Sequence, residues 1–325
     1  MHEARQPTFM GNANTAALWS LLLVLGGPAC AQFPTSPIEI TVPFGVGNAA
    51  DISARHLADG LAKRLGVPVS AVNRPGGGGA VAFTHIVQQR PDGYALGYIT
   101  STISTSYYSG ILPFDYSAYA PVARVTTETP VLVVRADAPW RTVKQMVEDA
   151  KREPGKLRIG NSGTGTHTHL SAATLFAGAG VSIIGVPFGT GQAAVNLLEG
   201  KIEGVVQLPP AVIAQVKSGD LRVLAALASQ RDRIFPEAPT AAEDGFPVAP
   251  DLWRGIVIPR GIPAAVIKKL EETIRLVVAS PEFQDAGKKL GFLPAFLPAD
   301  DFGKLISADD KKLAALMAML GLKKR

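Results

Sequence analysis

The chain has 325 residues, of which 47% are hydrophobic and 18% are charged, and its formal net charge at pH 7 is +5. This length and composition describe a globular protein with enough chain for two domains and a sizeable core. Its 32 basic and 27 acidic residues are spread along the sequence. That spread argues against a nucleic-acid partner, although a mildly positive surface attracts anionic metabolites.

The N-terminus has the pattern of a targeting segment. Residues 16–27 form an apolar run that is too short to span a bilayer but has the length of a signal-peptide core. We expect residues 1–31 to be a signal peptide that is cleaved after Ala31 on export. Cleavage before Cys30, as in a lipoprotein, is the weaker alternative. Because Cys30 is the only cysteine, we expect an exported chain without a disulfide, a thiol nucleophile or a cysteine metal site.

The first predicted strand, residues 38–44, runs into a glycine-containing loop and then into a helix over residues 49–65. Asn48 is placed to cap this helix. Asp51 falls at the third helical position, where it can accept the backbone N–H of the cap and pair with Arg55 one turn later. We therefore favour a structural role for Asp51 over ligand contact.

Strand and helix signals alternate after this first unit. Residues 67–72 and 94–100 are predicted strands, and residues 80–89 are a predicted helix entered through the glycine-rich loop at residues 73–79. This order predicts a parallel sheet with ligand loops at one edge. Residues 101–108, rich in serine, threonine and tyrosine, either line a polar cleft or form a solvated loop.

The second half of the chain repeats the alternation of strands and helices, and the chain then returns to the first domain. Residues 122–135 predict a long strand, interrupted at Pro130, that crosses into a second domain, and residues 253–259 predict the returning strand. Between them we expect strands at 156–160, 182–187, 202–208 and 221–228, helices at 139–153, 192–199 and 210–217, and an irregular segment at 229–250. Amphipathic helices at residues 263–280 and 300–320 close the chain.

The segment from residue 157 to residue 178 joins a strand, a glycine-rich loop and the start of a helix. Its loop offers glycines for positive φ and hydroxyls for capping: Ser162, Gly163, Thr164, Gly165 and Thr166. The first turn of such a helix has unpaired N–H groups and the positive end of the dipole, so it can hold an anion without Lys or Arg. A well-capped turn is the alternative, and the similar loop at residues 43–50 favours the anion site.

Other chemistries are weaker. Residues 45–50 match the GxGxxA dinucleotide fingerprint, but the acidic residue expected about 20 residues later is missing, which leaves an exported nucleotide- or flavin-dependent enzyme as the alternative hypothesis. Residues 160–163 do not form a GxSxG elbow. His167 and His169 lie on different faces of a helix, without a carboxylate or cysteine at metal-ligand spacing. We expect a binding protein with no catalytic set, no metal and no cofactor.

Several segments together resemble the ordered motifs of the Bug family, the TctC-like solute receptors of tripartite tricarboxylate transporters. The matching segments are ITVPFGVGNAADISAR (40–55), VNRPGGGGA (72–80), PDGYAL (91–96), GKLRIGNSGTGTHTHLSAATLF (155–176), GVPFGTGQAAVNLLEG (185–200) and RDRIFPEAPTAAEDG (231–245). The resemblance runs from about residue 34 to the C-terminus.

This resemblance implies an α/β, two-lobed type II periplasmic-binding-protein fold, in which each lobe is a mostly parallel sheet flanked by helices and the ligand binds between them. We place lobe 1 at residues 32–130 and 254–325 and lobe 2 at residues 131–253, with hinges near residues 131–134 and 253–256. It implies a periplasmic monomer that passes a small organic carboxylate to the membrane subunits of a tripartite transporter. A ligand sensor for a membrane kinase is a further alternative.

The candidate ligand-binding residues lie in loops that match the family. They are Phe44, Gly45, Gly47, Asn48, Asp51, Gly77, Gly78, Ser162, Gly163, Thr164, Gly165, Thr166, His169 and Phe188. The family grips carboxylates with such loops, mainly by backbone N–H groups, hydroxyls and water. His169 matches the family's histidine and is either a ligand contact or a core or capping residue. Residues 43–48 and 188–190 depart from the family pattern, which makes a smaller, aromatic or amidated carboxylate as plausible as a tricarboxylate.

Overall fold

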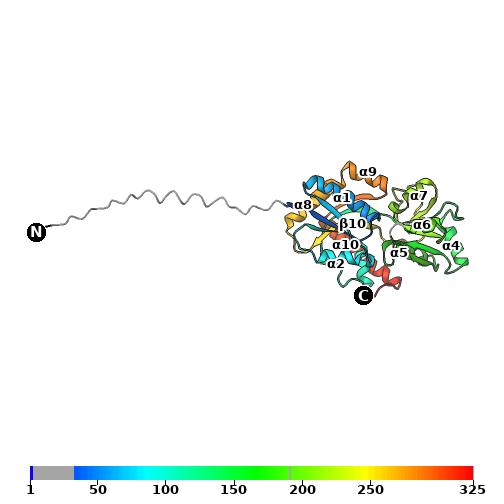
Figure 1. The fold of residues 1–325 in the computed structure, drawn as a ribbon. Coiled ribbons are helices and arrows are strands. Elements are labelled where there is room, and N and C mark those ends of the chain that lie inside the picture. Colours follow the sequence, from blue (N-terminus) through cyan, green and yellow to red (C-terminus); the bar gives the residue numbers. More distant parts are fainter. Residues whose placement is uncertain (3–32, 190–191, 325) are drawn as a thin grey trace. The chain divides into compact units, whose positions relative to one another are not determined.

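Two β-sheets and their helices organise residues 36–325, which form one unit (Figure 1). The computed structural model describes residues 1–2, 33–189 and 192–324. Residues 1–35 form a separate unit. The expected signal peptide and its cleavage site therefore lie, apart from residues 1–2, outside the described residues.

The first sheet has six strands in the order β11-β4-β10-β3-β1-β2. These strands are β1 (Ile38–Val42), β2 (Val69–Asn73), β3 (Ala95–Thr100), β4 (Tyr119–Glu128), β10 (Leu252–Pro259) and β11 (Leu293–Pro298). β1 is parallel to β2 and β3, as expected, but β10 is antiparallel to both β3 and β4, and β11 is antiparallel to β4. The sheet is mixed because β4 leaves for the second sheet and β10 returns from it alongside.

Helices flank this sheet, and we call the sheet with its helices the first lobe. They are α1 (Ala49–Leu65), α2 (Ala80–Val87), α3 (Thr102–Tyr108), α8 (Ala264–Val278), α9 (Pro281–Leu290) and α10 (Ala299–Met319), with short 3₁₀ turns at Gly77–Gly79 and Tyr116–Ala118. A core of buried aromatic and aliphatic side chains, including Phe83, Ile99, Trp253 and Phe302, joins the helices to the strands. Burial of such side chains is the main stabilising contribution to the lobe.

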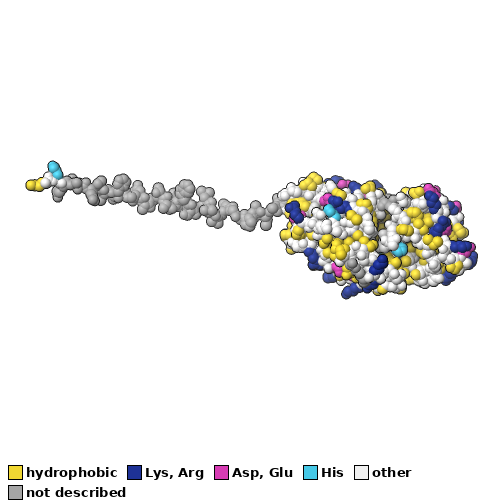
Figure 2. Space-filling model, turned by 60° about the horizontal axis from the view of Figure 1, so that its bottom comes forward, with side chains coloured by type: hydrophobic (Ala, Val, Ile, Leu, Met, Phe, Trp, Pro, Cys, Tyr) yellow, Lys and Arg dark blue, Asp and Glu magenta, His cyan; other side chains and the backbone are white. Residues whose placement is uncertain are grey.

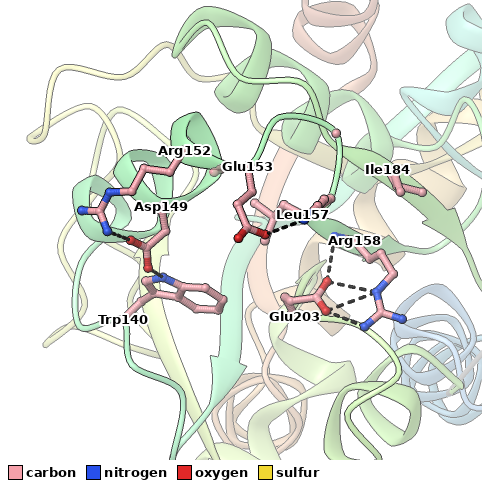
Figure 3. A pocket seen from close by; sticks show the side chains of 11 residues that line it. Trp140, Asp149, Arg152, Glu153, Leu157, Arg158, Ile184 and Glu203 are labelled. Atoms are coloured by element: carbon pink, nitrogen blue, oxygen red, sulfur yellow. Dashed lines mark hydrogen bonds and ion pairs between the residues drawn. The ribbon is translucent and has the colours of Figure 1, made fainter.

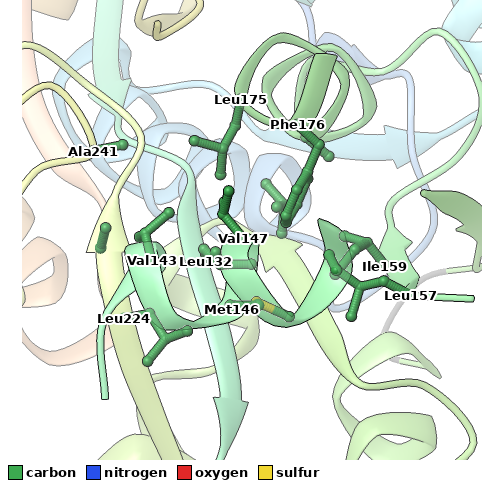
Figure 4. Packing of buried hydrophobic residues seen from close by; sticks show 14 of the residues in the cluster. Leu132, Val143, Met146, Val147, Leu157, Ile159, Leu175, Phe176, Leu224 and Ala241 are labelled. Atoms are coloured by element: carbon green, nitrogen blue, oxygen red, sulfur yellow. The ribbon is translucent and has the colours of Figure 1, made fainter. Parts of the chain in front are cut away.

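The second sheet has five strands in the order β7-β6-β8-β5-β9 and, with its helices, forms the second lobe. Its strands are β5 (Val131–Arg135), β6 (Arg158–Asn161), β7 (Ile184–Pro187), β8 (Gly204–Gln207) and β9 (Leu221–Ala226); its helices are α4 (Val143–Arg152), α5 (His167–Gly178), α6 (Gln192–Leu198) and α7 (Ile213–Ser218), with a 3₁₀ turn at Pro209–Ala211. Leu132 packs with Met146 and Phe176 on one side of the sheet (Figure 4), and Val133 lies beside its ladder partner Val205 in a cluster on the other side. The two-residue period of a strand explains this division.

The chain passes between the two sheets twice. The first connection is only Thr129 and Pro130, between β4 and β5, and the second is residues 227–251, between β9 and β10. The two connections lie together, because Leu227 N–H donates to the Pro130 carbonyl at 2.7 Å. The hinge ranges expected from the sequence lie inside β5 and β10, at the ends of these two connections.

Three parts of the structure refine the expectations or go beyond them. The polar stretch at residues 101–108, expected either to line a polar cleft or to form a solvated loop, is mostly helix α3, and its residues Thr102 to Ser106 are buried. The strand expected at residues 122–135, with its interruption at Pro130 and its crossing into a second domain, is present as β4 and β5 in different sheets, because proline cannot donate to a ladder. Helix α9 and strand β11 were not predicted from the sequence. The short β11 contains prolines and has neither a long apolar run nor a clear alternation of apolar and polar residues.

Candidate functional site

The β1–α1 loop is held by its own side chains. Asn48 caps α1, as expected, by accepting a hydrogen bond from Ala50 N at 2.9 Å. The buried Asp51 carboxylate accepts hydrogen bonds from Gly47 N at 2.9 Å and from Asn73 Nδ2 at 2.9 Å, and pairs with Arg55 at 2.8 Å. Burial acts to raise the pKa of Asp51, but hydrogen bonds from Arg55 and Gly47 outweigh it and lower the pKa. Asp51 thus fixes the loop, and its backbone donor is Gly47 rather than the cap.

The β6–α5 loop is built in the same way. Thr166 caps α5, accepting weakly from His169 N at 3.5 Å and donating to the Gly163 carbonyl at 2.7 Å. Gly165 N donates to His169 Nδ1 at 3.1 Å. Gly163 and Gly165 have φ of 129° and 77°, which only glycine adopts without strain. His169 is therefore a positioning residue for the loop, and burial lowers its pKa.

Few of the loop N–H groups remain available to a ligand. Ser162 N donates to Thr168 Oγ1 and Gly163 N donates to Asn161 Oδ1, each at 2.9 Å. The first N–H groups of α5, at His167 and Thr168, have no acceptor within the helix. These groups, with the start of α1, carry the positive ends of the two helix dipoles.

The two helix starts meet at a small hollow between the lobes, which we call the interlobe cavity. It is lined by Phe44, Asn48, Thr100, Thr102, Ser162, Thr166, His167, Thr168, Leu208, Leu252 and Arg254. Its volume is about 30 Å³, about the volume of one water molecule in the liquid. An interlobe hydrogen bond from Thr105 Oγ1 to the Gly165 carbonyl, 2.7 Å long, closes the lobes beside it.

The sequence-based candidates divide in relation to this cavity. Four of them line it: Phe44, Asn48, Ser162 and Thr166. The others do not line it: Gly45, Gly47, Asp51, Gly77, Gly78, Gly163, Thr164, Gly165, His169 and Phe188. Gly78 approaches the opposite loop, because a Cβ there would lie 3.8 Å from the Thr164 carbonyl oxygen. Phe188 packs on the hydrophobic cluster behind the second sheet.

Six lining residues were missed by the sequence reasoning: Thr100, His167, Thr168, Leu208, Leu252 and Arg254. A seventh, Thr102, lies in the polar stretch at residues 101–108, for which a cleft-lining role was one of the two expectations. The sequence did contain a signal for Arg254, which is a charged residue inside the otherwise apolar strand at residues 253–259. All eight residues of this strand, β10, are buried in the structure. A buried cation requires an anionic partner, and Glu128 could have been sought at the end of the strand before Pro130.

Arg254 and Glu128 form a buried ion pair at the edge of the interlobe cavity. Their side chains are only 2% and 0% exposed. Arg254 Nη2 lies 2.7 Å from Glu128 Oε2, and Arg254 Nε lies 3.1 Å and 3.2 Å from the two carboxylate oxygens. The carboxylate thus neutralises the guanidinium, so the cavity gains hydrogen-bond donors with little net charge.

His167 lies on the other side of the cavity, at the first position of α5. Its Nδ1 is 3.5 Å from Ser101 Oγ, and its buried Nε2 makes no hydrogen bond within the described residues. Burial and then the charge of Arg254 lower the pKa of His167 to about 4, against a small opposing effect of the Pro250 carbonyl. The imidazole is therefore neutral at pH 7.

A larger hollow lies at the outer edge of the second lobe, between α4 and the edge strand β7 (Figure 3). Its volume is about 700 Å³. Its charged side chains hold one another: Arg158 with Glu203, Arg152 with Asp149, and Lys156 with Glu153. Because these charges are already paired and no ligand loop reaches it, we do not take it as the functional site.

The distribution of charged side chains, the length of the helices and the grouping of possible metal ligands bear on what the protein can bind. Figure 2 shows Lys and Arg side chains scattered among Asp and Glu over the face in view. In the described part of the chain, no helix has the length and apolarity needed to cross a membrane. The same part contains no cluster of three or more His, Cys, Asp or Glu side chains suited to a metal ion.

Two lobes joined by two strand connections, with helix starts from both lobes meeting at a polar cavity, define a two-lobed solute-binding protein. The profile of the family described as "Tripartite tricarboxylate transporter family receptor" matches residues 53–322. The chain belongs to this family, as its motifs predicted.

Individual relatives agree with this assignment. The chain is 30% identical over 312 residues to a UPF0065 protein of Bordetella pertussis, covering 93% of this chain and 95% of that protein. It is 29% identical over 306 residues to the protein BugT of the same organism, covering 92% and 94%.

Solved structures share the fold. A Rhodopseudomonas palustris protein, solved with adipate, is 25% identical and superposes with a TM-score of 0.84 over 89% of this chain and 98% of its own. MatC from the same organism, solved with bound malate, is 25% identical with a TM-score of 0.79 over 87% and 99%.

Proposed function

We propose that this protein is an extracytoplasmic receptor that captures a small organic carboxylate between its lobes and delivers it to the membrane subunits of a tripartite transporter. The observation that carries the proposal is the meeting of the α1 and α5 N-termini, one from each lobe, at a cavity lined by hydroxyls and an amide. Helix N-termini attract carboxylates through unpaired N–H groups and the dipole. The adipate and malate bound to the two R. palustris proteins support this ligand class.

We infer that Asn48, Ser162 and Thr166 contact the ligand, and that the remaining loop candidates hold these three in place. Asn48 Oδ1 is used by the helix cap, which leaves its Nδ2 as a donor. Ser162 Oγ donates to Gln207 Oε1 at 2.9 Å, so its lone pairs can accept from a ligand hydroxyl.

We infer that the lobes must part to admit a ligand. Ligand-binding cavities usually have volumes of about 300–1,000 Å³, ten or more times the volume of the interlobe cavity. Opening breaks the contact between Thr105 and Gly165 and bends the two connections between the sheets. The strands of the two sheets support lobe boundaries close to those expected at residues 32–130 with 254–325 and at 131–253, except that β10 of the first sheet begins at Leu252.

We further propose a periplasmic protein that is cleaved after Ala31, acts as a monomer and is not an enzyme. The family consists of transporter receptors, which supports export and a binding role. The loop at residues 45–50 resembles a dinucleotide fingerprint, but its Gly47 N–H is bound to Asp51 and is therefore less available to a pyrophosphate.

A thermal-shift screen of residues 32–325 tests the proposal. The panel contains acetate, benzoate, succinate, malate, adipate and citrate, with NAD and FAD as controls. A carboxylate at about a hundred times its dissociation constant adds about 2.7 kcal/mol to the free energy of unfolding, so the melting temperature should rise with one class of acid. A rise with NAD or FAD alone, or with none of the acids, would contradict the carboxylate receptor.

A further inference from the structure

Two buried side chains at the interlobe cavity have donor groups that the protein itself does not use. One is the Arg254 guanidinium, which has five N–H groups in a rigid plane. Its Nε and Nη2 are directed to Glu128, whereas its Nη1 makes no hydrogen bond within the described residues. Because Arg254 lines the cavity and is only 2% exposed, a group bound in the cavity is the natural acceptor for Nη1.

The second side chain is the His167 imidazole, which is 4% exposed and lines the same cavity. If Ser101 Oγ donates to Nδ1, the proton of the neutral ring is on Nε2. Nε2 is then a buried donor without a hydrogen bond of normal geometry in the described chain, although the Pro250 carbonyl is an acceptor near the ring. A donor without a well-placed partner lowers stability unless a partner satisfies it.

The two donors come from opposite lobes. Arg254 belongs to β10 of the first lobe, and His167 begins α5 of the second. Both side chains line the interlobe cavity, and the charge of Arg254 acts to lower the pKa of His167. One anionic group placed between them can accept from both only when the lobes are closed.

We propose that Arg254 Nη1 and His167 Nε2 donate hydrogen bonds to the same carboxylate of the ligand. These two hydrogen bonds recognise the carboxylate and couple its binding to lobe closure. This inference rests on the proposed function and deepens it. Because Glu128 neutralises Arg254 and no other lining side chain is charged, the cavity suits one carboxylate better than several. The ligand is therefore a mono- or dicarboxylate rather than a tricarboxylate.

Calorimetry on the exported protein tests this, with malate, adipate and the monoamide of adipate as probes. Arg254→Gln is made together with Glu128→Gln, so that no unpaired charge is buried. His167→Phe removes the donor and His167→Gln retains one. The matched control is His85→Phe, because His85 lies near Glu39 and does not line the interlobe cavity.

We expect the double variant and His167→Phe to weaken adipate or malate binding by about 10- to 100-fold, the range of one charge-assisted hydrogen bond. His167→Gln and His85→Phe should stay within about threefold of wild type, a change of less than one such hydrogen bond. Replacing adipate by its monoamide should weaken binding less in the double variant than in wild type, because the double variant already lacks the guanidinium donor. This double-mutant cycle separates the contact from any effect of the substitutions on folding.

If His167→Phe and the double variant both bind the carboxylate as tightly as wild type does, this inference is wrong, but the proposed receptor function still stands. Failure of wild type to bind any carboxylate would overturn the receptor and the inference together. If the double variant does not fold, the two His167 variants decide the question, because neither leaves a buried charge unpaired.

Discussion

Arg254 holds Glu128 through Nε and Nη2 at 2.7–3.2 Å, across the two strands that carry the chain to and from the second lobe. Leu252 is paired with Glu128, and Arg254 with Thr126, in the antiparallel ladder of β10 and β4. The ion pair therefore ties the outgoing strand to the returning one directly beside the hinge connections. Both residues belong to strands of the first sheet, and Arg254 also lines the interlobe cavity.

Breaking this pair should destabilise the protein more than replacing it. We expect Glu128→Gln alone to lower the free energy of unfolding by about 3–5 kcal/mol, because it leaves a buried guanidinium without a countercharge. The double variant Glu128→Gln/Arg254→Gln should lose clearly less. Urea unfolding at pH 7 measures both, and equal losses would show that the charge is not what matters here.

His167 should make stability depend on pH. Its folded-state pKa of about 4 lies below the ordinary value of about 6.5, so the unfolded chain binds more protons between these values. The contribution of His167 to the free energy of unfolding should therefore be fully present above pH 6.5. It should fall by up to about 3 kcal/mol as the pH drops to 4. Burial also lowers the pKa of His169 and raises the pKa of Asp232, so these groups add their own dependence on pH. The difference between wild type and His167→Gln isolates the effect, and parallel stability curves would contradict it.

Gly165 should be sensitive to any side chain. Its φ is 77°, yet a Cβ would have no atom within 4 Å, so strain rather than crowding sets the cost in the closed form. We expect Gly165→Ala to cost about 1–2 kcal/mol and Gly165→Val more. Gly180, with φ of 70° and equally open space, is the matched control. Both alanine variants should lose similar stability in urea, but only Gly165→Ala should weaken carboxylate binding; equal affinities would remove Gly165 from the site.

Asn48 should matter for both folding and binding. Asn48→Ala removes the α1 cap and should cost about 1 kcal/mol of stability. It also removes an amide donor at the interlobe cavity. Thr142→Ala is the control, because Thr142 caps α4 through a capping box away from the cavity. We expect similar shifts in melting temperature for the two variants and a loss of affinity only for Asn48→Ala. A matching loss in Thr142→Ala would mean that stability alone explains the effect.

Local patterns predicted the scaffold of the site well. Asn48 was the expected cap of α1 and is its cap, and of the three hydroxyl residues expected to cap α5, Ser162, Thr164 and Thr166, the last is the cap. These features are local, because a cap and its helix lie within a few residues of each other. The sequence left two alternatives open for the polar stretch at residues 101–108, a cleft lining or a solvated loop, for the opposite reason. Its burial and helical form depend on contacts with residues far along the chain, such as Gly165.

The sequence by itself determined the alternating strands and helices, the two anion-sized loops at helix starts and the family, because each is written in short, ordered segments. Only the tertiary structure decided which residues line the interlobe cavity. Arg254 and Glu128 are 126 residues apart, and His167 and Ser101 are 66 apart. Separations of this kind leave no periodic signal in a single sequence, so the buried charge and the neutral histidine become parts of one site only when the two lobes fold together.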